Sequence, residues 1–347
     1  MRTTLLIAAV FVLGLGCDET TPLDGGPDPV DAGGRDAGGR DAGVDAGEGD
    51  GGTDAGPLDA GSPDAAVDAG PPTDPLDGIG TVEQVATDFA FLEGPHWREA
   101  DGVLLFTDIP RSTIHRLAPP NTVDVFRMPS DAANGLATLP DGRLLAAEHG
   151  ARRVSVTGSD GTVSAYAATF MDDRFNSPND IAVRSDGTIY FTDPPYGLGG
   201  APRELDFNGV FRVSPAETVS VEWMGATSSR PNGVSLSPDE TVLYVADTAG
   251  GEVRAFDVAS DGSTSGERVF ATDTPGADGM AVDVAGNLFV TTSAGVRVYA
   301  PDGALWGTID IPEAPANCAF GDTDHRTLYV TARTSLYRVR LTIEGDL

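Results

Sequence analysis

From Glu93 to Arg333 the hydrophobic and polar residues follow a unit that occurs six times. In each unit a polar residue with a side-chain oxygen opens a short alternation of apolar and polar positions, and a turn separates this alternation from a fuller apolar run. A period of two predicts a β-strand with one buried face, and a continuous apolar run predicts a strand buried on both faces. Units 39 to 53 residues apart that contain only strands and turns are typical of a β-propeller with one blade per unit. The sequence therefore predicts an all-β fold, a six-bladed β-propeller.

The register within the units agrees with this fold. The distance from the opening residue to the central turn is seven residues in five units and eight in the first. The alternating segment, such as residues 234–236, is expected to lie next to the propeller axis, with the apolar run, such as residues 242–246, behind it. Residues 81–91 and 336–343 are expected to pair and close the ring, which removes exposed sheet edges.

The six opening residues occupy equivalent positions and should emerge together at one end of the central channel. We call them the polar ring: Glu93, Asn134, Asn179, Asn232, Asp278 and Asn317. Two carboxylates and four amide oxygens around a narrow axis are unfavourable unless a cation or ordered water satisfies them. A hard divalent cation with six to eight oxygen ligands fits this set, and Ca²⁺ suits it better than Mg²⁺ or Zn²⁺. The sequence thus predicts a central metal site.

A simpler interpretation of the same residues is a recurring tight turn. Asn-Gly, Asp-Gly and Asn-Asp are turn dipeptides, and each of them opens at least one unit. Taken one at a time, Asn134 and Asn317 fit this interpretation. It does not explain Glu93, because glutamate is a poor turn residue.

The first 77 residues have a different composition. Residues 1–17 hold Arg2, an apolar stretch too short to span a bilayer, and then Gly16-Cys17, as in a secretory signal. A cysteine at this place resembles the bacterial lipobox, so Cys17 is the expected lipidation site; the alternative is an ordinary signal peptide with an incidental cysteine. Residues 18–77 are rich in Asp, Ala, Gly and Pro, carry a net charge of −14, and are predicted to form a disordered acidic linker. Export and a lipid anchor would place the protein outside the cytoplasm, at a bacterial membrane, in the periplasm or on the cell surface.

Residues 78–347, the expected propeller, exclude several classes of function. They contain 19 arginines against 37 carboxylates, and this acidic balance argues against nucleic acid as a partner. The chain has no lysine, so no lysine Schiff base can form. With four histidines and Cys318 as the remaining cysteine, a Cys/His zinc site lacks ligands. No Gly-x-Ser-x-Gly motif supports serine-hydrolase chemistry. A closed ring without open edges predicts a monomer.

Several segments resemble the calcium-dependent six-bladed propellers of the regucalcin (senescence marker protein)/gluconolactonase family, over most of residues 88–340. The similar segments are Phe91-Leu-Glu-Gly-Pro-His-Trp97, Ser177-Pro-Asn-Asp180, Pro231-Asn-Gly-Val234 and Ala277-Asp-Gly-Met280. The resemblance implies Glu93, Asn179, Asn232 and Asp278 as metal ligands, with Asp278 also the proposed general base. The bacterial gluconolactonase branch is the most similar, through Ala147-Glu-His-Gly150, Asp193-Pro-Pro-Tyr196 and Asn317-Cys-Ala-Phe320. One departure is Asp322 after Gly321, where that branch commonly has a second glycine.

The resemblance implies a hydrolase that opens a sugar lactone, a small-molecule substrate, with Ca²⁺ or another divalent cation polarising the carbonyl and positioning water. Asn134, His149 and Asn317 are the expected substrate-binding residues. Asp108, Tyr196 and Asp247 are also expected near the mouth of the channel. Two other hypotheses remain open: the same metal site acting on an organophosphate or another lactone, and a tethered binding propeller without enzymatic activity.

Overall fold

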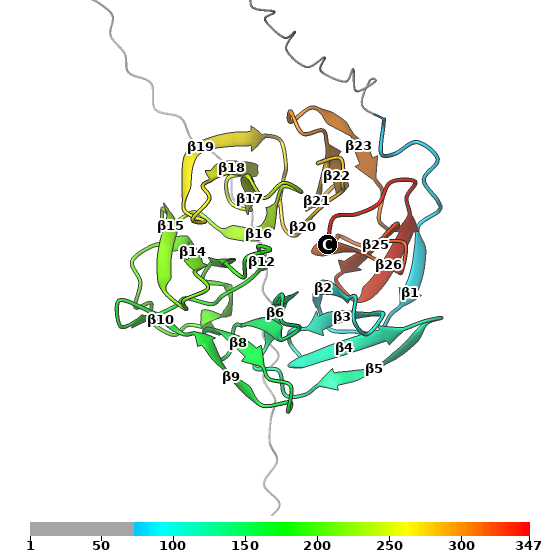
Figure 1. Ribbon diagram of the computed structural model, residues 1–347. Helices are drawn as coiled ribbons and strands as arrows, with labels where there is room; N and C mark the ends of the chain where they lie inside the picture. Colours follow the sequence, from blue (N-terminus) through cyan, green and yellow to red (C-terminus); the bar gives the residue numbers. More distant parts are fainter. Residues whose placement is uncertain (1–72) are drawn as a thin grey trace, which may run out of the picture. The chain divides into compact units, whose positions relative to one another are not determined.

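The computed structural model describes residues 73–347, which form a β-propeller of six four-stranded antiparallel sheets (Figure 1). The expected signal peptide, the lipidation site Cys17 and most of the expected linker lie outside the described residues and stay predictions. Leu76, assigned to the linker from the sequence, packs with the hydrophobic cluster between the fifth and sixth blades. Within residues 73–347 no helix is both long and apolar enough to cross a bilayer.

Each blade runs from an innermost strand at the axis to an outermost strand at the rim. The first blade contains β2 (Leu92–Arg98), β3 (Val103–Asp108), β4 (Thr113–Ala118) and β5 (Thr122–Arg127). The second contains β6 (Ala133–Thr138), β7 (Leu144–Glu148), β8 (Arg153–Thr157) and β9 (Val163–Ala167). The third contains β12 (Ile181–Val183), β13 (Ile189–Asp193), β14 (Asn208–Val213) and β15 (Val219–Gly225).

The remaining blades follow the same order. The fourth contains β16 (Pro231–Leu236), β17 (Val242–Asp247), β18 (Glu252–Val258) and β19 (Thr264–Ala271). The fifth contains β20 (Met280–Val282), β21 (Leu288–Thr292), β22 (Gly295–Tyr299) and β23 (Leu305–Ile309). The sixth contains β24 (Asn317–Gly321), β25 (Thr327–Ala332), β26 (Ser335–Arg340) and β1 (Glu83–Ala86). A short hairpin of β10 (Thr169–Phe170) and β11 (Asp173–Arg174) and one turn of 3₁₀ helix, η1 (Tyr196–Leu198), lie in connections.

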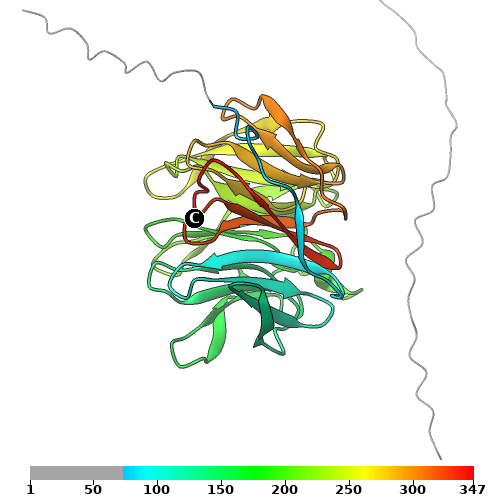
Figure 2. The same ribbon diagram turned by 90° about the vertical axis from the view of Figure 1, so that its right-hand side faces the viewer.

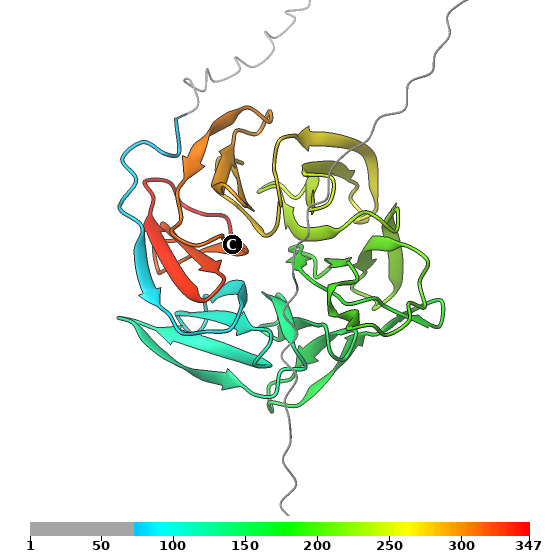
Figure 3. The same cartoon turned by 180° about the vertical axis from the view of Figure 1, so that it is seen from behind.

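The expected closure of the ring is confirmed. Strand β1 pairs antiparallel with β26, so the sixth blade takes its outermost strand from the other end of the domain. In Figure 2 the blue segment that contains β1 runs beside the red β26. Seen from behind, in Figure 3, the six sheets again surround the axis.

Six hydrophobic clusters hold the blades together, one at each interface between neighbouring blades. The second strand of each blade supplies both of its interfaces, because successive side chains point to opposite faces of the sheet. In β13, Ile189 and Phe191 pack toward the second blade, whereas Tyr190 packs toward the fourth. This double burial explains why the run after each central turn is continuously apolar rather than alternating.

Candidate functional site

The residues of the polar ring open the innermost strands, as the repeat predicted. Glu93, Asn134, Asn232 and Asn317 lie at the starts of β2, β6, β16 and β24, and Asn179 and Asp278 lie two residues before β12 and β20. Five of the six are buried, with exposed fractions of 2 to 6%, and Asp278 is half-buried. Six buried or half-buried oxygen-bearing side chains therefore meet at one level of the channel.

Close packing between neighbouring innermost strands explains the glycines that follow four of these residues. The amide of Gly135 donates to the carbonyl of Asn179 at 2.7 Å, and the amide of Gly233 donates to that of Asp278 at 3.1 Å. A Cβ on Gly135 or Gly233 would collide with these partner segments. Since neither glycine has a positive φ, the requirement is inter-blade contact and not a turn conformation. The turn interpretation is thus wrong for Asn134, and for Asn317 as well, because both lie within strands.

Gly279 offers a direct test of this contact. Its amide donates to the carbonyl of Ala316 at 2.8 Å, and an added Cβ would overlap the side chain and backbone of Asn317. We expect Gly279→Ala to lower the free energy of unfolding by about 3 kcal/mol, because the added Cβ would overlap the Cα of Asn317 as well as its buried side chain. Urea unfolding would measure this loss of stability. The control is Gly187→Ala, in an open surface turn, which should lower the free energy of unfolding by about 1 kcal/mol because Gly187 has a positive φ. Equal losses in the two variants would contradict the close inter-blade contact.

Asp180 is a site residue that the sequence prediction missed. It takes the place that glycine occupies in four of the other units, and its Oδ2 accepts a hydrogen bond from the amide of Val234 at 3.2 Å. Its side chain reaches the ring, because a Cβ on Gly135 would lie 2.6 Å from Asp180 Oδ1. The signal in the sequence was a third carboxylate at a glycine position of the repeat.

Three carboxylates therefore share the centre of the ring. Burial, followed by the charge of Asp180, raises the pKa of Glu93 to about 8, and burial raises the pKa of Asp180 to about 6. Burial, followed by the charges of Glu93 and Asp180, raises the pKa of Asp278 well above its usual value. None of the ion pairs formed within residues 73–347 includes any of the three. The site concentrates negative charge that no arginine neutralises through an ion pair within residues 73–347.

The donor set fits a hard cation. Oδ1 of Asp278 and Oδ1 of Asn134 are buried and have no hydrogen-bond partner among the described residues, which is costly for an acceptor unless a ligand satisfies it. In the described part of the chain no three His, Cys, Asp or Glu side chains are placed to hold a metal by themselves. A cation here would therefore also need amide oxygens, which suit Ca²⁺ and do not suit Zn²⁺.

A second set of carboxylates positions the segments that lead into the innermost strands. Both oxygens of Asp193, at the end of β13, accept backbone hydrogen bonds, from Asn176 at 2.7 Å and from Ser177 at 2.8 Å. Asp108 accepts in the same way from residues 90 and 91, and Asp247 from Arg230. Asp108 and Asp247 lie at the ends of second strands and are buried, and their place near the channel mouth stays a prediction.

His149 and Tyr196 lie on the side of the ring from which these segments enter. Burial lowers the pKa of His149 to about 4, and its Nε2 has no hydrogen-bond partner in the described part of the chain. Gly197 of η1 packs against the side chain of His149, where a Cβ would collide. Burial raises the pKa of the half-exposed Tyr196, and neighbouring Thr248 and Asp278 also affect it. Tyr196 is therefore close to the ring and open to solvent.

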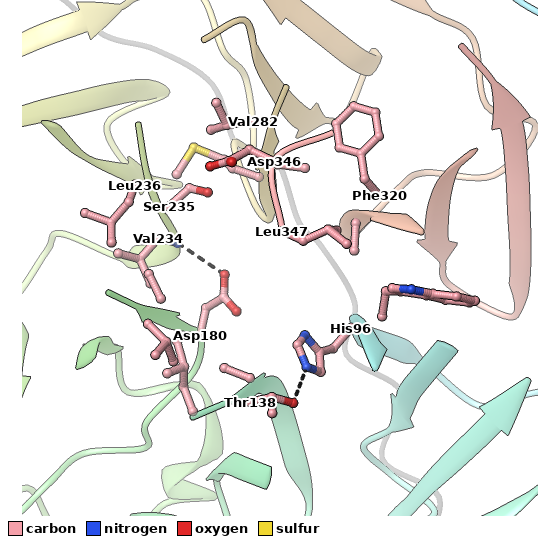
Figure 4. A pocket seen from close by; sticks show the side chains of 18 of the residues that line it. His96, Thr138, Asp180, Val234, Ser235, Leu236, Val282, Phe320, Asp346 and Leu347 are labelled. Atoms are coloured by element: carbon pink, nitrogen blue, oxygen red, sulfur yellow. Dashed lines mark hydrogen bonds between the residues drawn. The ribbon is translucent and has the colours of Figure 1, made fainter. Parts of the chain in front are cut away.

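A cavity of about 410 Å³ lies on the opposite side of the ring, within the central channel (Figure 4). All six innermost strands line it, together with Asp346 and Leu347. Asp180 and His96 point into it, and Nε2 of His96 lies 2.7 Å from Oγ1 of Thr138. Of the residues at the level of the ring, Asp180 and Asn317 also border this cavity.

Comparison with known proteins identifies the family. The family model described as the SMP-30/Gluconolactonase/LRE-like region matches residues 91–334. The chain belongs to this family. It is 35% identical to a gluconolactonase of Zymomonas mobilis over 76% of this chain and 82% of that protein, and 29% identical to regucalcin of Oryctolagus cuniculus over 69% and 82%. The solved structure of XC5397, a gluconolactonase from Xanthomonas campestris, superposes with a TM-score of 0.71 at 33% identity, over 76% of this chain and 89% of that one.

Family membership confirms the resemblance and the fold expected from the sequence. The four positions matched to the family's motifs, Glu93, Asn179, Asn232 and Asp278, all belong to the polar ring. Their roles as metal ligands, and those of Asn134, His149 and Asn317 toward a substrate, remain predictions.

Proposed function

We propose that this protein is a calcium-dependent hydrolase that opens sugar lactones. The observation that carries the proposal is the cluster of buried Glu93 and Asp180 with half-buried Asp278, which lies among amide oxygens and forms no ion pair within residues 73–347. Such a cluster is stable when a cation shares it. The similarity to gluconolactonases supports a lactone as the substrate.

Glu93, Asn179, Asn232 and Asp278 would hold the cation. Bound there, Ca²⁺ supplies a Lewis acid for the carbonyl oxygen of the substrate. Asn134 contributes the free acceptor Oδ1, and neutral His149 contributes the free Nε2, so both suit hydrogen bonds to sugar hydroxyl groups. Asn317 faces the same centre, because its side chain lies close enough to Glu93 and Asp180 to lower the pKa of both.

Asp278 is the proposed general base. Its Oδ1 is the unsatisfied acceptor at the ring, so it is placed to take a proton from a water molecule. The water oxygen then bonds to the carbonyl carbon and the bond from this carbon to the ring oxygen breaks. The proton passes from Asp278 to the departing ring oxygen, and the product is a hydroxy acid. Tyr196 lies beside Asp278 and would orient the incoming substrate.

The test of the proposal is hydrolysis of D-glucono-1,5-lactone by the full-length chain in the presence of Ca²⁺. The reaction is monitored through the protons that it releases. We expect saturable acceleration over spontaneous hydrolysis, with a turnover number of about 10 to 10³ s⁻¹. Acceleration of phosphotriester hydrolysis without lactone hydrolysis would replace the proposed substrate. Calcium binding without turnover of either class would contradict the enzymatic function and indicate a binding propeller.

A further inference from the structure

Almost every arginine of the propeller is paired with a carboxylate. Residues 73–347 contain 19 arginines, and 15 of them form ion pairs. This is expected in a domain with almost twice as many carboxylates as arginines. Four arginines form no ion pair within the described residues: Arg174, Arg203, Arg230 and Arg333.

These four arginines lie on one face of the propeller. In an antiparallel blade, the segment leading into the innermost strand and the connection between the second and third strands are at the same end. Arg174 and Arg230 precede the innermost strands β12 and β16, and Arg203 lies between β13 and β14. Arg333 lies between β25 and β26. The unpaired positive charges therefore all belong to the face at which the polar ring opens.

Two of the four, Arg203 and Arg230, are held near each other by hydrogen bonds to one loop. Burial, followed by the charge of Arg230, lowers the pKa of Arg203, and the charge of Asp193 raises it. Arg203 Nη2 donates to Oδ1 of Asn208, whose Nδ2 donates to the carbonyl of Ser229 at 2.7 Å. Arg230 Nη1 donates to the carbonyls of residues 227–229 at 2.8 to 3.0 Å. The same loop thus anchors both arginines.

The pair is also connected to the polar ring. Arg230 lies two residues before Asn232 of the polar ring, and its amide donates to Oδ1 of Asp247 at 2.8 Å. Asn208 accepts a hydrogen bond from Nδ2 of Asn176, three residues before Asn179. The charge of Asp278 raises the pKa of Tyr196, and the charge of Arg230 lowers it. The two arginines therefore lie next to the site, at the side of the third and fourth blades.

Two neighbouring guanidinium groups repel each other; the buried carboxylate of Asp193 offsets part of this repulsion at Arg203, and an anion placed between the two groups would offset more of it. Arg203 Nη1 and Arg230 Nη2 make no hydrogen bond with the described residues, so both groups retain donors. Guanidinium groups bind carboxylate, phosphate and sulfonate oxygens through two parallel hydrogen bonds. The ring beside them is negatively charged and would repel an anion, so a separate positive subsite is needed for an anionic substrate.

We propose that Arg203 and Arg230 form an anion subsite, which selects lactones that carry a negatively charged group at the end remote from the lactone carbonyl. This inference rests on the proposed lactonase function. Arg174 and Arg333, on the same face, add to the positive potential that draws such a substrate to the mouth. A neutral sugar lactone would occupy the ring without using the subsite.

The test compares kcat/KM for 6-phospho-D-glucono-1,5-lactone, D-glucaro-1,5-lactone, which carries a free carboxylate at C6, and neutral D-glucono-1,5-lactone. We expect Arg203→Gln with Arg230→Gln to lower kcat/KM for the charged lactones about 10- to 100-fold more than for the neutral one. The preference for the charged lactones should also fall between about 0.05 M and about 0.5 M NaCl. Comparison of the phosphate with the carboxylate shows which anion the subsite prefers. Arg116→Gln with Arg268→Gln, a double variant at two exposed positions with the same total charge change, should alter none of these ratios.

A binding measurement separates this inference from the proposed function. Calorimetry with 6-phosphogluconate and gluconate, both product-like and unreactive, reports the subsite even if no lactone is hydrolysed. Tighter binding of the phosphate that the double variant abolishes supports the subsite. Equal affinities for the two ligands, or equal losses of kcat/KM for charged and neutral lactones, would overturn it, whereas failure to hydrolyse any lactone would overturn the proposed function alone.

Discussion

Asp278→Asn is expected to lower kcat for lactone hydrolysis about 10³-fold, within the range for loss of a general base. The substitution keeps an oxygen at the position of the cation ligand and removes the group that accepts a proton. Asp278 is suited to this role because burial and the neighbouring Glu93 and Asp180 raise its pKa well above that of an ordinary aspartate. A carboxylate with a raised pKa is a stronger base, and a bound cation offsets part of this rise because it favours the ionised form.

The loss of the base must be distinguished from loss of the cation. Thermal unfolding of the variant at increasing calcium concentrations should still show a rise in Tm. The variant should need a higher calcium concentration than the native protein to reach the same rise. Asp302→Asn, the same substitution in an exposed turn of the same blade, should leave kcat unchanged. Full activity of Asp278→Asn with saturating calcium would remove Asp278 as the base and leave His149 as the remaining candidate.

The fold could be predicted because its determinants are local and repeated. Period-two alternation fixes which face of a strand is buried, and the six-fold recurrence fixes the number of blades. The same recurrence placed six polar side chains at one level, because equivalent positions of a closed ring are related by rotation about the axis. The pairing of β1 with β26 followed from the need to remove the free edges of the sheet.

What the sequence did not reveal depends on contacts between blades. Asp180 was overlooked because glycine occupies its place in most of the repeats. The function of this place, close contact with the neighbouring innermost strand, is visible only in the folded structure. Asp247 was expected near the mouth because it ends a strand, but the sequence did not show that its Oδ1 accepts hydrogen bonds from the backbone amides of Arg230 and Ala249. Which arginines lack a carboxylate partner is likewise a property of the folded surface, and Arg203 has no motif that singles it out.

Removal of the divalent cation is expected to abolish turnover and to destabilise the fold. Without a cation, the three carboxylates remain close together with no ion-pair partner among residues 73–347, and the lactone carbonyl has no Lewis acid. A ligand present at about 100 times its dissociation constant stabilises by about 2.7 kcal/mol, which corresponds to a rise in Tm of roughly 5 to 10 °C for a domain of this size. Dialysis against a chelator, followed by thermal unfolding and lactone assays before and after addition of Ca²⁺, measures both effects.

The effect of the cation on Tm should depend on pH in a stated direction. In the metal-free protein the pKa of Glu93 is raised from 4.5 to about 8 and that of Asp180 from 3.8 to about 6, so the folded state retains protons that the unfolded chain has lost. The contribution of these groups to stability is full below about pH 4 and is lost as the pH rises toward about 8. Ca²⁺ binds the ionised carboxylates, so its stabilisation should grow over the same interval and should be larger at about pH 8 than at about pH 5.5.

Glu93→Gln should reduce both the calcium effect and its pH dependence, whereas Asp302→Asn should change neither. A calcium-induced rise in Tm that is the same at both pH values would show that the ring carboxylates are not the ligands.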